Sequence, residues 1–209
     1  MSSVQHLHAK AARALAAADP VLAPVIARAG QCTIRPHRDY YRALVNSIIG
    51  QQLSVKAAHT IKQRFVDMFD GAFPSPQDIL RTDVPALRGV GLSAQKAGYV
   101  RDLAAHIVDG TVSFDHLDKL DNDAIVAQLT AVKGIGEWTV HMFLIFCMGR
   151  PDVLATGDLG VRTGIMRLYQ LPALPSPAEV AQLARARGWH PYESIACWYI
   201  WYSLDNKPM

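Results

Sequence analysis

Apolar residues recur at helical spacing through almost the whole chain, and Pro or Gly interrupts this pattern at intervals of a few helical turns. The alternation of apolar and polar residues that marks half-buried strands is absent from the sequence. The pattern therefore predicts an all-α fold. The expected helices span residues 3–18, 20–30, 40–51, 54–69, 75–82, 83–87, 93–109, 121–131, 137–148, 159–169, 177–187 and 191–204.

Four of these helices begin at or directly after a residue whose side-chain oxygen can accept hydrogen bonds from the free amides of a first helical turn. These residues are Ser54, Ser93, Asp121 and Ser176. We therefore expect side-chain N-caps at these four helix starts.

The composition is that of a globular protein, with 50% hydrophobic and 19% charged residues among 209. No apolar run approaches the roughly 20 residues of a membrane-spanning helix, and residues 1–10 lack the apolar segment of a secretion signal. We therefore expect a cytoplasmic protein without a membrane partner. Cys32, Cys147 and Cys197 are far apart, which predicts reduced, buried thiols rather than disulfides, a zinc site or an iron–sulfur cluster.

Gly134 and Gly136 form a Gly-Ile-Gly hairpin between two of the expected helices. Glycine allows a tight turn in which several backbone amides converge, and the helix that follows presents its positive dipole end. Such a turn suits one phosphate group and reads no base. The net charge of +3 is mildly basic, so the hairpin is the main evidence for DNA binding.

Asp158 is an isolated acid that follows the hairpin and its helix and stands directly before a new helical pattern. One interpretation is an N-cap, because an Asp at this place satisfies free amides of the next helix. The other is a catalytic carboxylate that acts on a nucleic-acid base. The two are compatible, because a helix N-terminus favours the ionised form of a carboxylate.

Segments 46–54, 91–97, 134–139 and 200–202, together with Asp158, stand in the order and approximate spacing of the helix-hairpin-helix DNA glycosylases. The set is most similar to the 3-methyladenine DNA glycosylase II branch and covers roughly residues 36–204. This resemblance implies two helical lobes with the active site in the cleft between them. Residues 36–120 would form one lobe with the turn at Gln51 and Gln52, and residues 1–35 plus 121–209 the other, with the hairpin and Asp158. We expect the compact form, without the N-terminal β-rich domain of longer members.

The resemblance also implies an activity in base excision repair. The enzyme would flip alkylated bases such as 3-methyladenine and 7-methylguanine out of double-stranded DNA and hydrolyse the N-glycosidic bond, leaving an abasic site. Asp158 occupies the catalytic aspartate position, where an anion stabilises oxocarbenium character on the sugar. We expect a monomer that needs no cofactor for chemistry and is nucleoid-associated when bound to DNA.

By the same resemblance, the pocket for the flipped base is formed by Trp138, Met142, Leu159 and Trp201. Bifunctional relatives have a lysine nucleophile at the position of Trp138, so this chain is expected to lack AP-lyase activity. From the residues alone, core packing in an apolar helix is the preferred interpretation of Trp138, and the motif position reverses that preference.

Sequence-independent DNA contacts are expected from the turn and the hairpin, at Gln51, Gln52, Leu53, Lys133, Gly134, Ile135, Gly136 and Thr139. Gln52 stands where a side chain fills the gap left by the flipped nucleotide, although a solvent-exposed turn explains this pair equally well. The backbone carbonyls of Thr130, Val132 and Gly134 match the family's ligands for Na⁺ or K⁺, which would offset the phosphate's charge.

Two alternatives stay open. A non-enzymatic hairpin protein that binds DNA would require neither an acid at Asp158 nor an aromatic pocket. A glycosylase for oxidised or mismatched bases usually has the hairpin lysine, a cysteine cluster or both, and this chain has neither.

Overall fold

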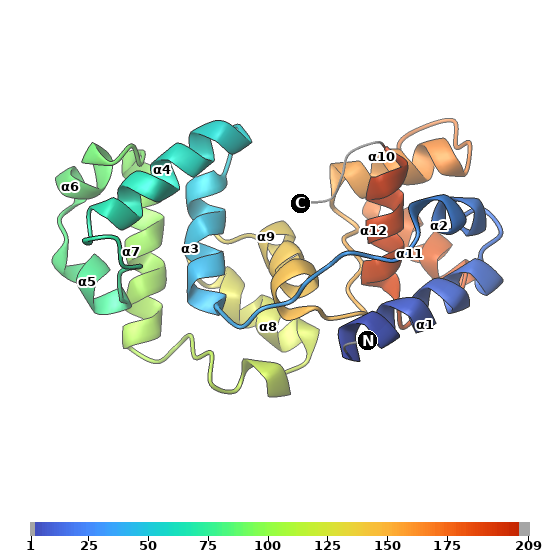
Figure 1. Ribbon diagram of the computed structural model, residues 1–209, viewed down its shortest axis with the longest axis horizontal. Coiled ribbons are helices and arrows are strands. Elements are labelled where there is room, and N and C mark those ends of the chain that lie inside the picture. The colour runs from blue at the N-terminus through green and yellow to red at the C-terminus, as the bar shows by residue number, and fades with distance from the viewer. Residues whose placement is uncertain (1–2, 205–209) are drawn as a thin grey trace. The chain divides into compact units, whose positions relative to one another are not determined.

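The computed structural model describes residues 3–204 (Figure 1), and within this range the chain forms helices and no β-strand. The predicted all-α fold is therefore confirmed. None of the helices in residues 3–204 combines the length and the apolar character needed to cross a bilayer. Cys32, Cys147 and Cys197 are buried, and none of the three is in a disulfide, as their spacing predicts.

Contacts divide the chain into two compact units. Unit 1 consists of residues 1–36 and 144–209, and unit 2 of residues 37–143. The second boundary differs from the expected division near residue 120, because the hairpin belongs to unit 2. The reason is long-range hydrogen bonding: the Lys133 amide donates to Asp102, and the Gln51 side chain donates to the Gly134 carbonyl.

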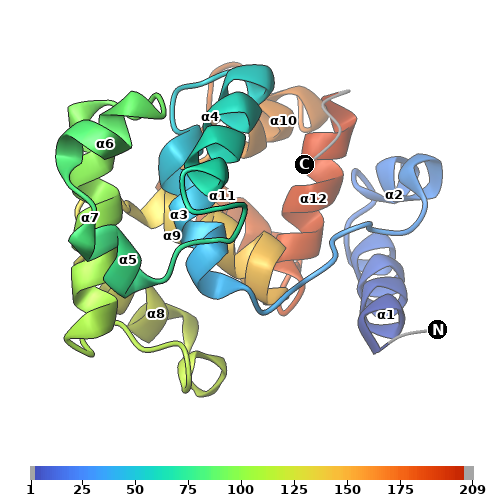
Figure 2. The ribbon, with the colours of Figure 1, turned by 60° about the vertical axis from the view of Figure 1, so that its left-hand side comes forward.

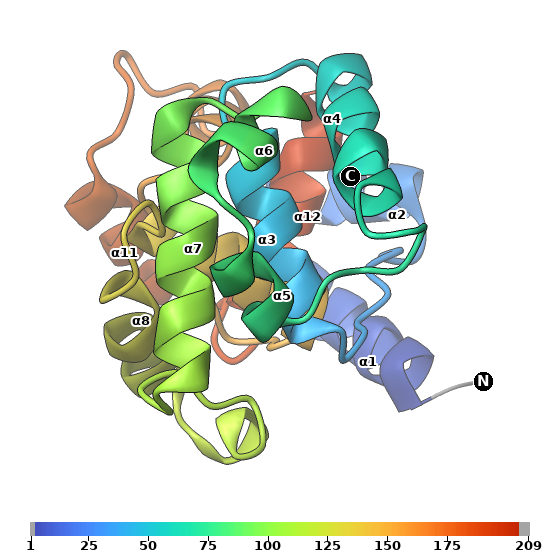
Figure 3. The same ribbon diagram turned by 90° about the vertical axis from the view of Figure 1, so that its left-hand side faces the viewer.

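Unit 2 is organised around one long helix, α7, which packs against α3, α5 and α6. Figure 3 shows α7 with α5 and α6 alongside it. The buried face of α7 carries Ala97, Val100, Leu103 and Ala104. The helices of this unit are α3 (Tyr40–Gly50), α4 (Val55–Asp67), α5 (Pro76–Arg81), α6 (Val84–Gly89), α7 (Ala94–Val108), a 3₁₀ turn η1 (Leu117–Lys119), α8 (Asn122–Thr130) and α9 (Glu137–Met142).

Unit 1 is built on α12, whose residues from Ser194 to Ile200 are all buried. This helix packs against α10, α2 and α1 (Figure 2). Because α12 is apolar on every side, it forms the centre of the unit rather than its surface. The helices of this unit are α1 (Ser3–Ala18), α2 (Ala23–Ala29), α10 (Leu159–Leu168), α11 (Pro177–Ala186) and α12 (Glu193–Ser203).

The four predicted N-caps are confirmed, since each side chain accepts a hydrogen bond from the third amide of its helix. The expected helix over residues 137–148 differs in its second half. It begins as α9, and Phe143–Met148 then form a π-helical turn, η2. Such a turn inserts one extra residue per turn and so changes which side chains face inward.

A buried carboxylate fixes the N-terminal segment to the rest of unit 1. Asp19, which follows α1, is fully buried and accepts hydrogen bonds from Trp189 Nε1 at 2.8 Å and from the Tyr169 hydroxyl. The amide of Val21 also donates to it, at 2.9 Å. Further along the segment, the Gly30 carbonyl accepts from the Tyr199 hydroxyl at 2.9 Å. Buried polar groups are therefore paired across three parts of the sequence.

Candidate functional site

Asp158 is the N-cap of α10, as one of the two interpretations predicts. Its backbone is extended (φ −72°, ψ 124°), and its Oδ1 accepts from the Val161 amide at 2.7 Å. The carboxylate therefore lies at the positive end of the helix dipole, where a negative charge is stabilised.

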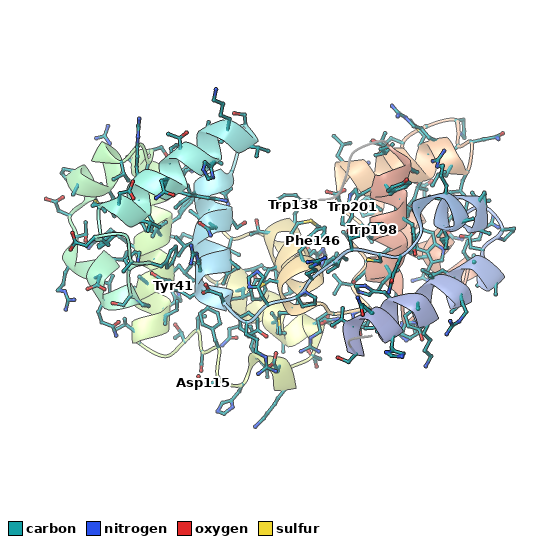
Figure 4. All side chains as sticks on the ribbon, viewed as in Figure 1. Tyr41, Asp115, Trp138, Phe146, Trp198 and Trp201 are labelled. Carbon is teal, nitrogen blue, oxygen red and sulfur yellow. The ribbon has the colours of Figure 1, made fainter. Side chains whose placement is uncertain are left out.

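The same oxygen accepts a second hydrogen bond, from the indole of Trp201 on α12. The distance from Trp201 Nε1 to Asp158 Oδ1 is 2.8 Å. The Trp201 ring in turn stacks on Phe146, with ring centroids 5.5 Å apart and planes at 30°. Figure 4 labels Phe146 and Trp201, which lie together in unit 1. The structure thus joins the predicted acid and the predicted stacking tryptophan directly, through a bond that orients both.

Gly160 makes room for this pair. A Cβ at this position would lie 3.0 Å from both Asp158 Oδ1 and Trp201 Nε1. One turn later, a Cβ at Gly164 would lie 2.4 Å from a side-chain carbon of Ile200. Glycine is therefore needed on this face of α10 for α12 to approach closely. Sequence reasoning missed Gly160 and Phe146, although the two glycines at i and i+4 next to Asp158 are a signal for close helix packing.

The loop before Asp158 is held by the N-terminal part of α12. Ser194 Oγ accepts from the Val153 amide at 3.0 Å and donates to the Val153 carbonyl at 3.2 Å. Cys197, one turn further along, is completely buried and hydrogen-bonds to the Ala155 backbone. Burial raises the pKa of Cys197 to about 12, so the thiol stays neutral beneath the loop. α12 therefore supports the loop and the carboxylate from one side, with residues at helical spacing.

Leu159 presents an apolar surface beside the carboxylate, with 64% of the residue exposed. A groove runs from it along α10 in unit 1, and its lining residues are Leu159, Gly160, Thr163, Arg167 and Leu204. An exposed leucine directly after an N-cap aspartate is unexpected for a solvent-facing helix start, and it suits contact with an apolar ring.

The hairpin between α8 and α9 has the geometry that its glycines predict. Gly134 has φ +83°, and a Cβ there would lie 2.1 Å from the ring of Tyr99. Val132 and Ile135 are almost fully buried, and the Ile135 amide donates to the Val132 carbonyl at 3.1 Å. Their burial anchors the turn, while Lys133 and Gly136 are exposed.

The turn between α3 and α4 is bonded to this hairpin within unit 2. Gln51 Nε2 donates to the Gly134 carbonyl at 2.8 Å. Gln52 follows with φ +56°, an unusual conformation for a residue other than glycine, and its side chain is exposed. Leu53 is 37% exposed. Of the two glutamines, Gln52 is therefore the one presented outward, whereas Gln51 is directed to the hairpin.

The structure limits which groups of the hairpin residues are available for the predicted DNA contacts. The side chain of Thr139 is directed inward, since Thr139 is 5% exposed and lies beside Val140 on the inner face of α9. The same holds for the Ile135 side chain, which is 3% exposed. The amides of Lys133 and Ile135 are already bonded to Asp102 and Val132.

The predicted cation ligands are also used differently. Two of the three carbonyls accept hydrogen bonds from the protein itself, Val132 from the Ile135 amide and Gly134 from Gln51. The three oxygens therefore do not form a set reserved for an ion.

On α9, Trp138 is 50% exposed, which excludes the interpretation that it is a core residue. Met142 is half-buried one turn further along the same helix. The His141 side chain lies inward, and its Nε2 is 3.6 Å from Glu137 Oε1. Burial lowers the pKa of His141, an effect that the Glu137 carboxylate partly offsets, so this ring is a neutral interior group.

These features agree with comparisons with known proteins. Residues 45–188 match the HhH-GPD superfamily of base excision DNA repair proteins. The chain belongs to this superfamily. It is 34% identical over 174 residues to DNA-3-methyladenine glycosylase 1 of Schizosaccharomyces pombe, an alignment that covers 80% of this chain and 75% of that protein.

Two solved structures of superfamily relatives have the same fold. The 3-methyladenine DNA glycosylase of Schizosaccharomyces pombe in complex with abasic DNA superposes with a TM-score of 0.78 at 32% identity, over 92% of this chain and 95% of that chain. The DNA-3-methyladenine glycosidase of Bacillus halodurans gives a TM-score of 0.83 at 34% identity, over 92% of this chain and 88% of that chain.

Proposed function

We propose that this superfamily member is a monofunctional DNA glycosylase that removes alkylated bases, such as 3-methyladenine and 7-methylguanine, from double-stranded DNA. The observation that carries the proposal is the pair formed by Asp158 and Trp201, in which one carboxylate is bonded both to a helix amide and to an indole. The names of the relatives in Schizosaccharomyces pombe and Bacillus halodurans support the substrate class.

The proposed chemistry is hydrolysis at the anomeric carbon. The bond between C1′ and the base nitrogen breaks, and its electron pair leaves with the base, which departs neutral when methylation has made it cationic. Positive charge develops on the sugar, and the Asp158 carboxylate stabilises that charge or orients the water that attacks C1′. Water supplies the new C1′–O bond and loses one proton to solvent. The product is an abasic site.

Within unit 1, Leu159 and Trp201 are proposed to line the base pocket, and Trp138 and Met142 of unit 2 stay predictions for the same role. Because Phe146 covers one face of the Trp201 ring, only the other face is available for a flipped base. A cationic base gains about 0.5–2 kcal/mol over an aromatic face. This gain is smaller than the rate advantage that a cationic base has over a neutral base as a leaving group. A weakly selective pocket therefore suffices to discriminate alkylated bases from normal ones.

We propose that two loops contact the DNA. One is the turn with Gln52 and Leu53, and the other is the hairpin. At the hairpin, the amides of Gly134 and Gly136 and the ammonium group of Lys133 would bind phosphate. A monovalent cation at the hairpin stays a prediction, since the carbonyls of Val132 and Gly134 each retain a second lone pair.

The direct test is chromatography of the bases that the protein releases from methylated DNA. We expect 3-methyladenine and 7-methylguanine in the soluble fraction. Release of oxidised or mismatched bases alone would favour the second kind of glycosylase. No release from a protein that binds DNA would favour a non-enzymatic DNA-binding protein.

Substitutions of the two hairpin glycines should differ in their effects on folding and on DNA affinity. Gly136 has φ −94°, and nothing lies within 4 Å of a Cβ built there, so Gly136→Ala should fold normally. It should nevertheless weaken binding to damaged and undamaged duplexes alike, by about ten-fold, because the methyl group obstructs the approach of a phosphate to the backbone. Fluorescence anisotropy with both duplexes measures this effect.

Gly134→Ala is the matched comparison. Its positive φ and the Tyr99 ring oppose any side chain, so this variant should lose thermal stability as well as affinity. If a folded Gly136→Ala protein bound duplexes with the parental affinity, the hairpin would not be a DNA contact.

The enzyme should stop at an intact abasic site. Trp138 stands at the hairpin position of the amine nucleophile in bifunctional relatives, and an indole forms no imine. The nearby Lys133 has its ammonium group 3.4 Å from Asp102 Oδ1. Borohydride should therefore trap no protein–DNA adduct, and strand breaks should appear only after alkali. Efficient trapping would overturn the monofunctional assignment.

A further inference from the structure

One face of α7 contacts both loops that are proposed to bind DNA. Lys96, Tyr99 and Asp102 stand at i, i+3 and i+6, so they share that face. Lys96 contacts the turn between α3 and α4, Tyr99 packs against Gly134, and Asp102 accepts from the Lys133 amide at 2.8 Å. All of these residues belong to unit 2.

Lys96 acts at the end of α3, where the chain leaves the helix. Its Nζ donates to the carbonyl of Ile49 at 2.8 Å and to that of Gln51 at 2.6 Å. The last carbonyls of a helix have no partner in the helix, and a positive charge is favoured there. The ammonium group therefore fixes the point at which the exposed turn begins, directly before Gln52 with its left-handed backbone.

Gln51 completes the connection from the other side. Its carbonyl is held by Lys96, while its side-chain amide donates to the Gly134 carbonyl at 2.8 Å. The backbone of the turn and the backbone of the hairpin are thus joined by a chain of three hydrogen bonds that uses no exposed side chain.

We propose that Lys96 is a positioning residue which, together with Gln51, holds the Gln52 turn in register with the hairpin. The inference rests on the proposed function. Extruding a base costs unpairing and unstacking energy, and a side chain that fills the gap recovers this cost only if its position relative to the bound phosphate is fixed beforehand. Lys96 thereby promotes base flipping without itself touching DNA.

The competing role for Lys96 is a direct phosphate contact, as for any lysine near a DNA-binding surface. The two roles differ in salt dependence. Loss of a phosphate contact lowers the slope of log affinity against log salt by about one, whereas loss of a positioning residue leaves the slope unchanged.

The test compares Lys96→Met with Lys119→Met, which removes a charge from an exposed lysine elsewhere in the same unit. The substrate is a duplex with one 7-methylguanine and a neighbouring 2-aminopurine, whose fluorescence rises when the adjacent base leaves the stack. For Lys96→Met we expect a fluorescence change well below that of the parent and about a ten-fold slower single-turnover release, because hydrogen bonds from a charged group are lost. The salt slope on undamaged DNA should equal the parental slope. Lys96→Arg, which retains a donor for these carbonyls, should recover part of the loss.

A slope reduced by about one, or release as fast as in Lys119→Met, would overturn the proposal. Should Lys96→Met fail to fold, Gln51→Ala breaks the same connection without touching a charge. Reduced flipping in that variant supports the proposal, and parental flipping contradicts it. Absence of base release by the parent protein would instead contradict the proposed function, so the two failures are distinguishable.

Discussion

Asp158→Asn should lower the single-turnover rate of base release by about 10²–10³-fold or more, the loss typical for removal of one group that stabilises transition-state charge. The amide oxygen can still accept from the Val161 amide and from Trp201, so the N-cap of α10 and the loop before it should keep their structure. Only the negative charge is lost. Rapid-quench assays on methylated DNA, with circular dichroism and duplex affinity as folding controls, measure this effect.

Asp121→Asn is the matched control. Asp121 caps α8 in the same way, accepting from the Ala124 amide at 2.7 Å. This variant should release bases at the parental rate. Equal rates for Asp158→Asn and the parent would exclude Asp158 as the catalytic group.

Trp201 should increase the rate of base release in two separable ways, through its hydrogen bond to Asp158 and through stacking on the base. Trp201→Phe keeps an aromatic ring against Phe146 but removes the N–H that donates to Asp158, and we expect about a ten-fold slower release. Trp201→Ala also removes base stacking, which is worth about 1–3 kcal/mol, so its rate should fall about ten-fold or more below that of Trp201→Phe. Affinity for undamaged duplex should stay near the parental value in both variants.

Trp198, on the same helix, provides a control for the Trp201 variants. It is 4% exposed and stacks on Tyr202, so Trp198→Phe should lower thermal stability and leave the rate of release in the folded protein unchanged. Equal losses on damaged and undamaged DNA for Trp201→Ala would make Trp201 a core residue. A parental rate for Trp201→Phe would show that its hydrogen bond does not position the carboxylate.

Local chemistry explains why the helices were predictable. Helical periodicity and capping side chains depend on neighbours a few residues away, so the starts after Ser54 and Ser93 follow from the sequence. Asp158 was predictable both as a cap and as a candidate acid, because each interpretation needs only its position before α10. The π-helical turn was not predictable, since an apolar run has no pattern that fixes where an extra residue enters.

The contacts that complete the site depend on distant parts of the chain. The bond from Trp201 to Asp158 spans 43 residues, and that from Gln51 to Gly134 spans 83. Neither leaves a periodic signal, because tertiary packing alone brings the partners together. The same limitation applies to Thr139, which stands in a recognisable motif although its side chain faces inward once α9 packs.

The buried carboxylate of Asp19 has a consequence for dissecting this protein. The superfamily match begins at residue 45, so Asp19 and Gly30 lie outside it. Their hydrogen-bond partners Trp189, Tyr169 and Tyr199 lie in the part of the chain that also carries Asp158. A fragment that began at residue 45 and ran to the end of α12 would leave the Trp189 indole N–H and the hydroxyls of Tyr169 and Tyr199 without these acceptors, at about 1–3 kcal/mol each. Residues 19–30 are thus an integral part of the unit that carries Asp158, and this folding unit is discontinuous in sequence.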